Sequence, residues 1–353
     1  MTKKKIIKIL GGGLSGLTAA INLARAGFVV QVFEKEDRVG KRFSGDLQGL
    51  ENWSAKEDVL EELEEMGIKT DFFKVPFSEI TLENGSGFAK DMHFKRPVFY
   101  LVLRGDEKGS LDNTLLDQAL ASGVKVFFNQ SIQAADADII ATGPASQKAV
   151  MIAKGIVFKT DSPDIAVGLF NDKAAYKGYS YLLVANGHGC LTTVLAGNFK
   201  SIKENFNYSK EKLLSTHPIN IFHERDFGGY GHFSLDPLWQ KGKNLYVGES
   251  TGLQDYFAGF GMRTAIKSGY LAARSIIIGT DYKSVANANF SNYLKATAVN
   301  RYVWEKINVK NYEFLLGKFT KYIDPGEFLL RNYNFTFNQR LIFPFAKRYF
   351  KSK

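Results

Sequence analysis

Three glycines near the start of the chain, Gly11, Gly13 and Gly16, have the spacing of a turn that binds a dinucleotide. In such a turn the first glycine allows a sharp bend, the second lets the backbone approach a pyrophosphate, and the third lets a helix pack closely on a strand. Glu34 follows 18 residues after Gly16, where a carboxylate accepts hydrogen bonds from a ribose diol. Because an acid here disfavours a 2′-phosphate, the motif predicts FAD or NAD.

The surrounding sequence contains the elements that must position this turn. Residues 5–10 predict a buried strand, residues 14–26 have apolar side chains at helical spacing, and residues 28–33 predict a second strand. The lysine-rich start and the apolar stretch after it also resemble a secretory signal peptide. Lys8 interrupts that stretch, and the strand–helix–strand pattern continues beyond any cleavage point. We therefore interpret the segment as a βαβ unit that binds a dinucleotide.

A basic, glycine-rich loop, EKEDRVGKRFSGDLQGLENW from Glu34 to Trp53, follows the second strand. With the glycine turn, it resembles the N-terminal signature of FAD-dependent oxidoreductases of the glutathione-reductase-like superfamily. It is most similar to the geranylgeranyl reductase family, which shares its architecture with the p-hydroxybenzoate hydroxylase-like flavoproteins. Later segments are similar to that family in the expected order: YLVLRGDEKGSLDNTLLDQALASGVKVFF from Tyr100, ADADIIATGP to Pro144, and NLYVGESTGLQDYFAGFGMRTAIKSGYLAARSI from Asn244.

The resemblance implies FAD as the cofactor and identifies a set of residues that would contact it. These residues are Gly11, Gly13, Leu14, Ser15, Gly16, Glu34, Lys35, Arg42, Phe43, Arg104, Ala141, Gly143, Gly248, Glu249, Gly259, Phe260, Gly261 and Met262. One of them departs from the family pattern, because Glu249 stands where the second FAD motif normally has aspartate. A longer carboxylate can still reach a ribitol hydroxyl.

Four residues are candidates for the chemistry itself: Ser44, Asp46, Tyr179 and Tyr181. Archaeal members of the family carry a cysteine in the flavin loop, where this chain has FSGD, so Ser44 cannot act as a thiolate. Asp46 could supply or orient a proton, or it could be a surface-loop carboxylate. The two tyrosines replace the aromatic residues of a family substrate motif and share one face of an expected strand. They line a cavity in one interpretation and belong to an ordinary sheet core in the other.

The net charge of +10 is concentrated near the C-terminus. Residues 290–353 contain 12 Lys and Arg against 4 Asp and Glu, and 16 of the 48 aromatic residues. Rings interleaved with cations suit a membrane surface, where rings insert and lysines pair with anionic lipid. A helical subdomain with an aromatic core is the alternative. This uneven distribution argues against nucleic acid as a partner, and no run of apolar residues is long enough to span a membrane.

Cysteine and histidine usage excludes several other kinds of site. Cys190 is the one cysteine, so no internal disulfide is expected, and the cytoplasm is the natural compartment. Peripheral contact with the inner face of the membrane remains an interpretation of the basic C-terminal segment. The five histidines have no metal-ligand spacing, and no metal site is predicted.

These observations predict an α/β protein of three parts. Residues 1–70, 103–150 and 240–280 would form a discontinuous Rossmann-like FAD-binding domain with a parallel sheet. Residues 71–102 and 151–239 would form an inserted antiparallel-sheet substrate domain, and residues 281–353 a basic, aromatic, mainly helical segment.

The resemblance implies reduction of carbon–carbon double bonds in a hydrophobic isoprenoid or lipid-like substrate, by hydride transfer from reduced flavin. The alternative is a flavin-dependent monooxygenase acting on an aromatic or polyketide substrate, and a non-enzymatic flavin-bearing lipid-binding protein is a third possibility. The chain has no second glycine turn of this type. Electrons would therefore come from an external donor, either transiently bound NAD(P)H or a reduced carrier protein.

Overall fold

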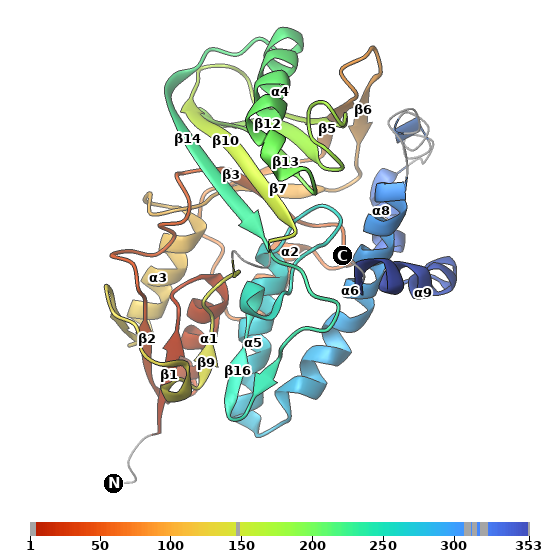
Figure 1. Ribbon diagram of the computed structural model, residues 1–353. Coiled ribbons are helices and arrows are strands. Elements are labelled where there is room, and N and C mark those ends of the chain that lie inside the picture. Colours follow the sequence, from red (N-terminus) through yellow and green to blue (C-terminus); the bar gives the residue numbers. More distant parts are fainter. Residues whose placement is uncertain (1–4, 146–148, 307–311, 313–315, 318–323, 352–353) are drawn as a thin grey trace.

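A computed structural model describes residues 5–145, 149–306, 312, 316–317 and 324–351. The chain begins with strand β1 (Ile6–Leu10), helix α1 (Leu14–Arg25) and strand β2 (Val29–Phe33). The two strands pair in parallel, with Ile9 opposite Val32. This is the βαβ unit expected from the sequence, and it lies at the lower left of Figure 1.

The unit belongs to a six-stranded sheet in the order β15-β16-β9-β1-β2-β8. Its other strands are β8 (Lys125–Phe127), β9 (Ile139–Ile140), β15 (Gln240–Lys241) and β16 (Asn244–Tyr246). All neighbouring pairs are parallel except β15–β16. The sheet therefore joins three stretches that are far apart along the chain.

Helices α1, α3 (Leu111–Ala121) and α5 (Met262–Ile278) accompany this sheet, and α1 packs against both α3 and α5. Ser110 caps α3 by accepting a hydrogen bond from Asn113 N at 3.1 Å, which satisfies one of the free amides of the first turn. Helices α1 and α5 cross closely because Gly269 has no side chain, since a Cβ there would lie 2.1 Å from Ser15 O. Their apolar faces form the largest part of the core around the parallel strands.

A second sheet has seven strands in the order β14-β10-β13-β12-β11-β5-β6. These strands are β5 (Glu79–Glu83), β6 (Ala89–His93), β10 (Met151–Lys159), β11 (Ile165–Leu169), β12 (Tyr179–Ala185), β13 (His188–Leu195) and β14 (Phe222–Gly231). The sheet is antiparallel, as expected, except that β5 and β11 pair in parallel. The long connection between these two strands makes the parallel pairing sterically feasible.

Helix α4 (Ile202–Thr216) packs on this sheet, mainly against β10 and β13. A small antiparallel sheet of β4 (Lys74–Phe77), β7 (Phe99–Leu103) and β3 (Leu47–Glu51) lies between the two large sheets, and short helix α2 (Val59–Glu65) follows β3. The described residues also include the 3₁₀ turns η1 (Ala134–Asp136) and η4 (Gly248–Thr251), next to strands of the parallel sheet, and η3 (Phe199–Ser201), just before α4.

The described part of the C-terminal segment is helical, as the sequence predicted. It includes α6 (Tyr282–Lys306), α8 (Pro325–Asn332) and α9 (Phe337–Lys351), on the right of Figure 1. Helices α6 and α9 pack through a small core that includes Ala296, Val299 and Ala346. Within the described residues, no helix combines the length and the hydropathy that a membrane span requires. The overall architecture confirms the expected fold class.

Candidate functional site

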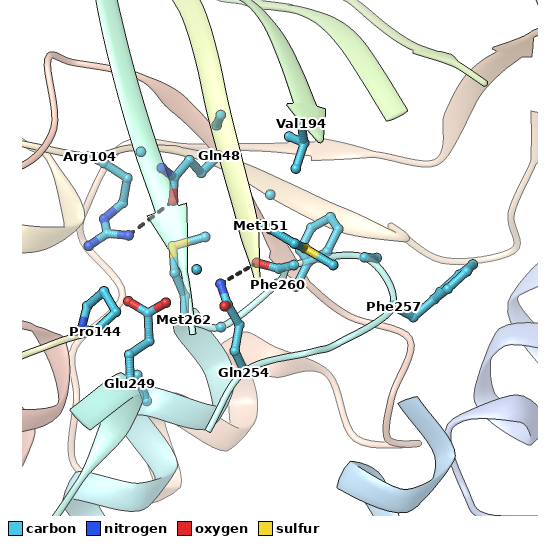
Figure 2. A pocket seen from close by; sticks show the side chains of 18 of the residues that line it. Gln48, Arg104, Pro144, Met151, Val194, Glu249, Gln254, Phe257, Phe260 and Met262 are labelled. Atoms are coloured by element: carbon cyan, nitrogen blue, oxygen red, sulfur yellow. Dashed lines mark hydrogen bonds between the residues drawn. The ribbon is translucent and has the colours of Figure 1, made fainter. Parts of the chain in front are cut away.

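One continuous cavity of about 1240 Å³ connects the β1–α1 turn with the C-terminal helices. Its first half lies between the parallel sheet, the loop before β3 and the start of α5. Its second half lies between the large sheet and helices α6, α8 and α9. Figure 2 shows polar side chains, including Gln48, Arg104 and Glu249, on one side of the cavity, with Phe257 on the other. The two halves therefore differ in chemistry.

The glycine turn has the geometry that each of its glycines was expected to provide. Gly11 has φ +106°, and a Cβ there would lie 2.3 Å from Ala141 O. A Cβ on Gly16 would lie 2.2 Å from Gly11 O, so the helix packs tightly on the turn. Around Gly13, in contrast, a Cβ would meet nothing within 4 Å. Gly13 and the adjoining Leu14 line the cavity, and the space beside them is open to a ligand.

Two helices begin at this cavity without a side-chain cap. Gly13 precedes α1 and Gly261 precedes α5, and neither residue offers an oxygen to the amides of the first turn. Such N-termini favour an anion, because their free N–H groups and the helix dipole act together. Ser15 and Met262 line the cavity at the starts of these helices. The pair of uncapped helix ends fits the phosphates and polar ring atoms of a dinucleotide.

Glu34 is held at the end of β2 by backbone amides. Its Oε2 accepts a hydrogen bond from Gly12 N at 2.7 Å, and its Oε1 accepts one from Glu36 N at 3.0 Å. Lys35 also lines the cavity and forms a 3.3 Å ion pair with Glu36. The carboxylate is thus fixed beside the glycine turn, where a ribose would bind.

Glu249 lies at the cavity but already has a protein partner. Arg42 Nη1 donates to Glu249 Oε2 at 2.8 Å, and Arg42 Nη2 donates to Tyr230 O at 2.8 Å. Glu249 Oε1 is buried and has no hydrogen-bond partner among the described residues. Gly248 lies behind the lining, where a Cβ would come within 2.6 Å of Ser15 Oγ. One carboxylate oxygen therefore remains available to a ligand hydroxyl.

Arg104 is buried at the cavity wall and tied to the protein. Its Nε and Nη2 donate to the two carboxylate oxygens of Asp112 at 2.7 and 2.9 Å, and its Nη1 donates to Gln48 Oε1 at 3.1 Å. The guanidinium lies 3.9 Å from the centre of the Phe43 ring. This pairing fixes Gln48 and Phe43 against the cavity, where both are lining residues.

Of the loop residues proposed for catalysis, Asp46 is at the cavity and Ser44 is outside its lining. Asp46 is 1% exposed, so the surface-loop interpretation is wrong. It accepts hydrogen bonds from Ser44 N at 2.7 Å and from Gln48 Nε2 at 2.8 Å. Burial raises the pKa of the Asp46 carboxyl, although these hydrogen bonds act in the opposite direction. Ser44 therefore acts through its backbone N–H, which donates to Asp46, and its side chain does not line the cavity.

Tyr179 and Tyr181 both line the cavity, with ring centroids 6.0 Å apart. Tyr179 Oη donates to Ala258 O in the loop before α5, and burial raises the pKa of both phenols. This loop is arranged around Gln254, whose Nε2 donates to Gly259 O at 3.0 Å (Figure 2). The tyrosines therefore connect the sheet to the start of α5.

The other residues expected near a cofactor are also at the first half of the cavity. Ala141, Gly143, Gly259 and Phe260 belong to its lining, whereas Gly16 supports the turn from behind. The described residues contain no cluster of His, Cys, Asp or Glu that could hold a metal ion.

The sequence did not predict most of the residues that line the second half of the cavity. Apolar side chains of the large sheet line it together with aromatic residues from distant elements, among them Phe170, Phe257 and Trp304. The Trp304 ring lies 5.5 Å from Phe170 and 5.7 Å from Phe257, measured between centroids. Arg301, on the same helix as Trp304, also lines this half. No local motif marks these positions, because they meet only through tertiary packing.

A family model matches the glycine turn and the loop that follows it. A model of an NAD(P)-binding Rossmann-like domain matches residues 9–49. The zeta-carotene desaturase of Synechocystis sp. is 27% identical over 125 residues, which are 35% of this chain and 23% of the desaturase. The 4,4′-diaponeurosporene oxygenase of Staphylococcus haemolyticus is 52% identical over 40 residues, or 11% of this chain and 8% of the oxygenase. The chain thus spans less than a quarter of these curated relatives.

Similarity to solved structures extends over almost the whole chain. A geranylgeranyl bacteriochlorophyll reductase-like protein from Thermoplasma acidophilum superimposes with a TM-score of 0.72 at 15% identity, covering 99% of this chain and 100% of that one. A flavin-dependent brominase superimposes with a TM-score of 0.68 at 15% identity, with coverage of 99% and 100%. The chain therefore has the fold of the FAD-dependent oxidoreductases and monooxygenases, with their Rossmann-like dinucleotide-binding motif at residues 9–49.

Proposed function

We propose that the protein is an FAD-dependent oxidoreductase that reduces carbon–carbon double bonds of an elongated, hydrophobic substrate of the isoprenoid or lipid type. The observation that carries this proposal is the continuity of the cavity. A polar half with two uncapped helix ends leads directly into an apolar half, without an intervening wall. A substrate in the second half can therefore reach a ring held at the junction.

The residues of the first half fit FAD. The open space beside Gly13 and the start of α1 would hold the pyrophosphate, Glu34 the adenosine ribose, and Glu249 Oε1 a hydroxyl of the ribitol. The start of α5, with Met262, would face the ring system. When bound and reduced, FAD supplies a hydride.

The chain contributes a proton and a dry environment. Burial raises the pKa of Asp46, which favours the protonated carboxyl, and Gln48 holds that carboxyl in a fixed orientation at the cavity wall. We assign Asp46 the role of proton donor to the second carbon of the double bond. The apolar side chains of the second half exclude water from the reacting carbons.

The names of two similar proteins support the class of substrate. A zeta-carotene desaturase and a geranylgeranyl bacteriochlorophyll reductase-like protein are both named after isoprenoid compounds. The apolar lining of the second half, with Phe170 and Trp304, is compatible with such a chain. The electron donor in this proposal is external, either NAD(P)H or a reduced carrier protein.

Helix α9 would bring the protein to its substrate at a membrane surface. Phe337, Leu341 and Phe345 are 73%, 61% and 66% exposed, and their spacing of four residues places them on one helical face. Arg340 and Arg348 are exposed on the same side of the helix. Apolar side chains interleaved with cations favour an anionic lipid surface. The start of α9 also borders the cavity, so this face lies beside the substrate half.

An anaerobic experiment tests the proposed reaction. The FAD-loaded protein is reduced with dithionite, mixed with geranylgeraniol under nitrogen, and followed by absorbance of the flavin. Reoxidation together with a product that has gained two hydrogen atoms supports the proposal, and the fully saturated alcohol serves as the control. Reoxidation by O2 alone, with a hydroxylated product, would instead indicate a monooxygenase. Protein that cannot be loaded with FAD would refute both.

A further inference from the structure

A buried guanidinium in the substrate half has unused hydrogen-bond donors. Arg301, on α6, is 1% exposed, and its Nε donates to Glu305 Oε1 at 2.7 Å. Its Nη2 is buried without a hydrogen-bond partner among the described residues. A guanidinium has five N–H donors, and the bond to Glu305 uses one of them. Burying such a group with unsatisfied donors is unfavourable unless a ligand supplies acceptors.

Arg301 lies where a substrate would meet it. It lines the cavity one helical turn before Trp304. Burial and the charge of Asp255 raise the pKa of Tyr179, and the positive charge of Arg301 acts in the opposite direction. The Trp304 ring, one turn after Arg301, lies 5.5 Å from Phe170 between centroids. The unused donors are therefore close to the aromatic residues that line the route to the first half.

The charged residues that line this half are both cationic. Among the described lining residues from the large sheet and from helices α6, α8 and α9, the charged ones are Arg301 and Arg331. The acidic lining residues, such as Glu34, Asp46 and Glu249, belong to the first half. An anionic group at this end of the chamber would therefore meet guanidinium groups and no acidic residue of the described lining.

A carboxylate fits Arg301 better than a more highly charged group does. The planar guanidinium presents paired N–H donors that match the two oxygens of a carboxylate. The ion pair with Glu305 already balances the charge of Arg301. Glu305 repels any further negative charge, and this repulsion is smaller for a singly charged carboxylate than for a diphosphate.

We infer that Arg301 is the anchor for the carboxylate end of an elongated apolar substrate, a polyene or unsaturated lipid acid. This inference rests on the proposed use of the second half as a substrate site. The anchor holds the carboxylate among the C-terminal helices and directs the hydrocarbon chain along the aromatic residues toward Tyr179. Arg301 is thus a positioning and specificity residue, separate from the chemistry of reduction.

The test compares the binding of an acid and its ester in the absence of turnover. Oxidised, FAD-loaded protein is titrated with cis-parinaric acid and with its methyl ester, and the fluorescence of the polyene reports binding. Hydrogen bonds to a charged group predict that the acid binds about 10- to 100-fold more tightly than the ester. In the double variant Arg301→Met with Glu305→Gln, this preference should disappear while the affinity for the ester stays the same.

A matched control removes another buried ion pair. Arg263 pairs with Glu62 at 2.6 Å and is not part of the cavity lining, so Arg263→Met with Glu62→Gln should retain the preference for the acid. If the first double variant does not fold, Arg301→Lys replaces it and should lower the preference at least several-fold, because a lysine lacks the paired donors. Equal binding of acid and ester to the wild type, or an unchanged preference in the Arg301 variants, would overturn the inference.

The titration also separates this inference from the proposed reaction. A protein that prefers the acid through Arg301 but reduces no double bond would contradict the reductase proposal alone. A protein that reduces geranylgeraniol but binds acid and ester equally would contradict the anchor alone.

Discussion

Asp46 shows how a single residue can be recognised from the sequence while its environment cannot. Its place next to Gly45 in the flavin loop marked it as a candidate, but the sequence left a solvated carboxylate equally open. The structure buries it, because the loop folds back so that Ser44 N and Gln48 Nε2 both donate to it. Both hydrogen bonds are local, but the loop is held in place by the pairing of β3 with β7, beside which Arg104 N donates to Asp46 O. No local pattern specifies that pairing.

Replacing Asp46 with asparagine should slow alkene reduction by at least about 100-fold, because the variant lacks the proposed proton donor. Asparagine can still accept the hydrogen bond from Ser44 N, so the FAD content should be unchanged. The measurement is the single-turnover rate of flavin reoxidation by alkene under nitrogen. Ser44→Ala is the matched control and should react at the wild-type rate, since the Ser44 side chain lies outside the cavity lining. Equal rates for both variants would remove Asp46 from the mechanism.

Asp255 makes stability depend on pH. Burial raises its pKa to about 7, although Tyr333 Oη and Phe257 N donate to it at 2.7 and 2.8 Å. The native carboxyl therefore keeps its proton between about pH 4 and pH 7, where the unfolded carboxyl has lost its own. The free energy of unfolding consequently falls as pH rises through this window.

The variant Asp255→Asn should lack this pH dependence. The difference in free energy of unfolding, variant minus wild type, should increase between pH 4.5 and pH 7 by at most about 4 kcal/mol. Above pH 7 this difference should stay constant. Asparagine retains an acceptor for Phe257 N, so the loop before α5 is preserved. Urea unfolding at several pH values measures the difference. Parallel pH profiles for the two proteins would show that the carboxyl titrates normally.

At the scale of elements, the helices that could be predicted are those whose ends carry a local sequence signal, such as a capping serine or a terminal glycine. Helix α3 begins after the Ser110 cap, and α5 ends at Gly279, which has φ +74°. Helix α1 likewise spans Leu14–Arg25, where the sequence predicted a helix over residues 14–26. The parallel pairing of β5 with β11 could not be predicted, because the two strands are joined through a long connection that includes other elements. Pairing of this kind depends on the assembled sheet.

We expect the exposed apolar face of helix α9 to contact the membrane. The triple variant Phe337→Ser, Leu341→Ser, Phe345→Ser should bind phosphatidylcholine–phosphatidylglycerol vesicles at least about 10-fold more weakly, because each side chain loses apolar area that the lipid would cover. Co-sedimentation with vesicles is the measurement. The matched control replaces three exposed apolar residues elsewhere, Leu120, Phe222 and Ile278, which are 49%, 48% and 58% exposed. A similar loss in both triple variants would point to general surface hydrophobicity, and no loss would remove α9 as the contact.

At the scale of the whole molecule, the cavity is lined by residues that lie far apart in the sequence. The polar half could be predicted because its glycines and acids follow a motif whose spacing reflects backbone geometry. The apolar half could not, since Phe170 comes from a loop after β11, whereas Arg301 and Trp304 come from the last two turns of α6. Only the packing of the C-terminal helices against the large sheet brings them together.

Because its proposed contacts come from three distant parts of the chain, bound FAD should stabilise the whole fold. A ligand that binds only the native state adds about 4 kcal/mol at a thousand-fold excess over its Kd, so the melting temperature should rise with FAD concentration. Gly13→Val should abolish this rise without lowering the melting temperature of the FAD-free protein, because its side chain would enter open space. Gly16→Val should destabilise even the FAD-free protein, since its Cβ would lie 2.2 Å from Gly11 O. Differential scanning calorimetry distinguishes the two variants. A Gly13→Val protein that still responds to FAD would show that the pyrophosphate does not bind at this turn.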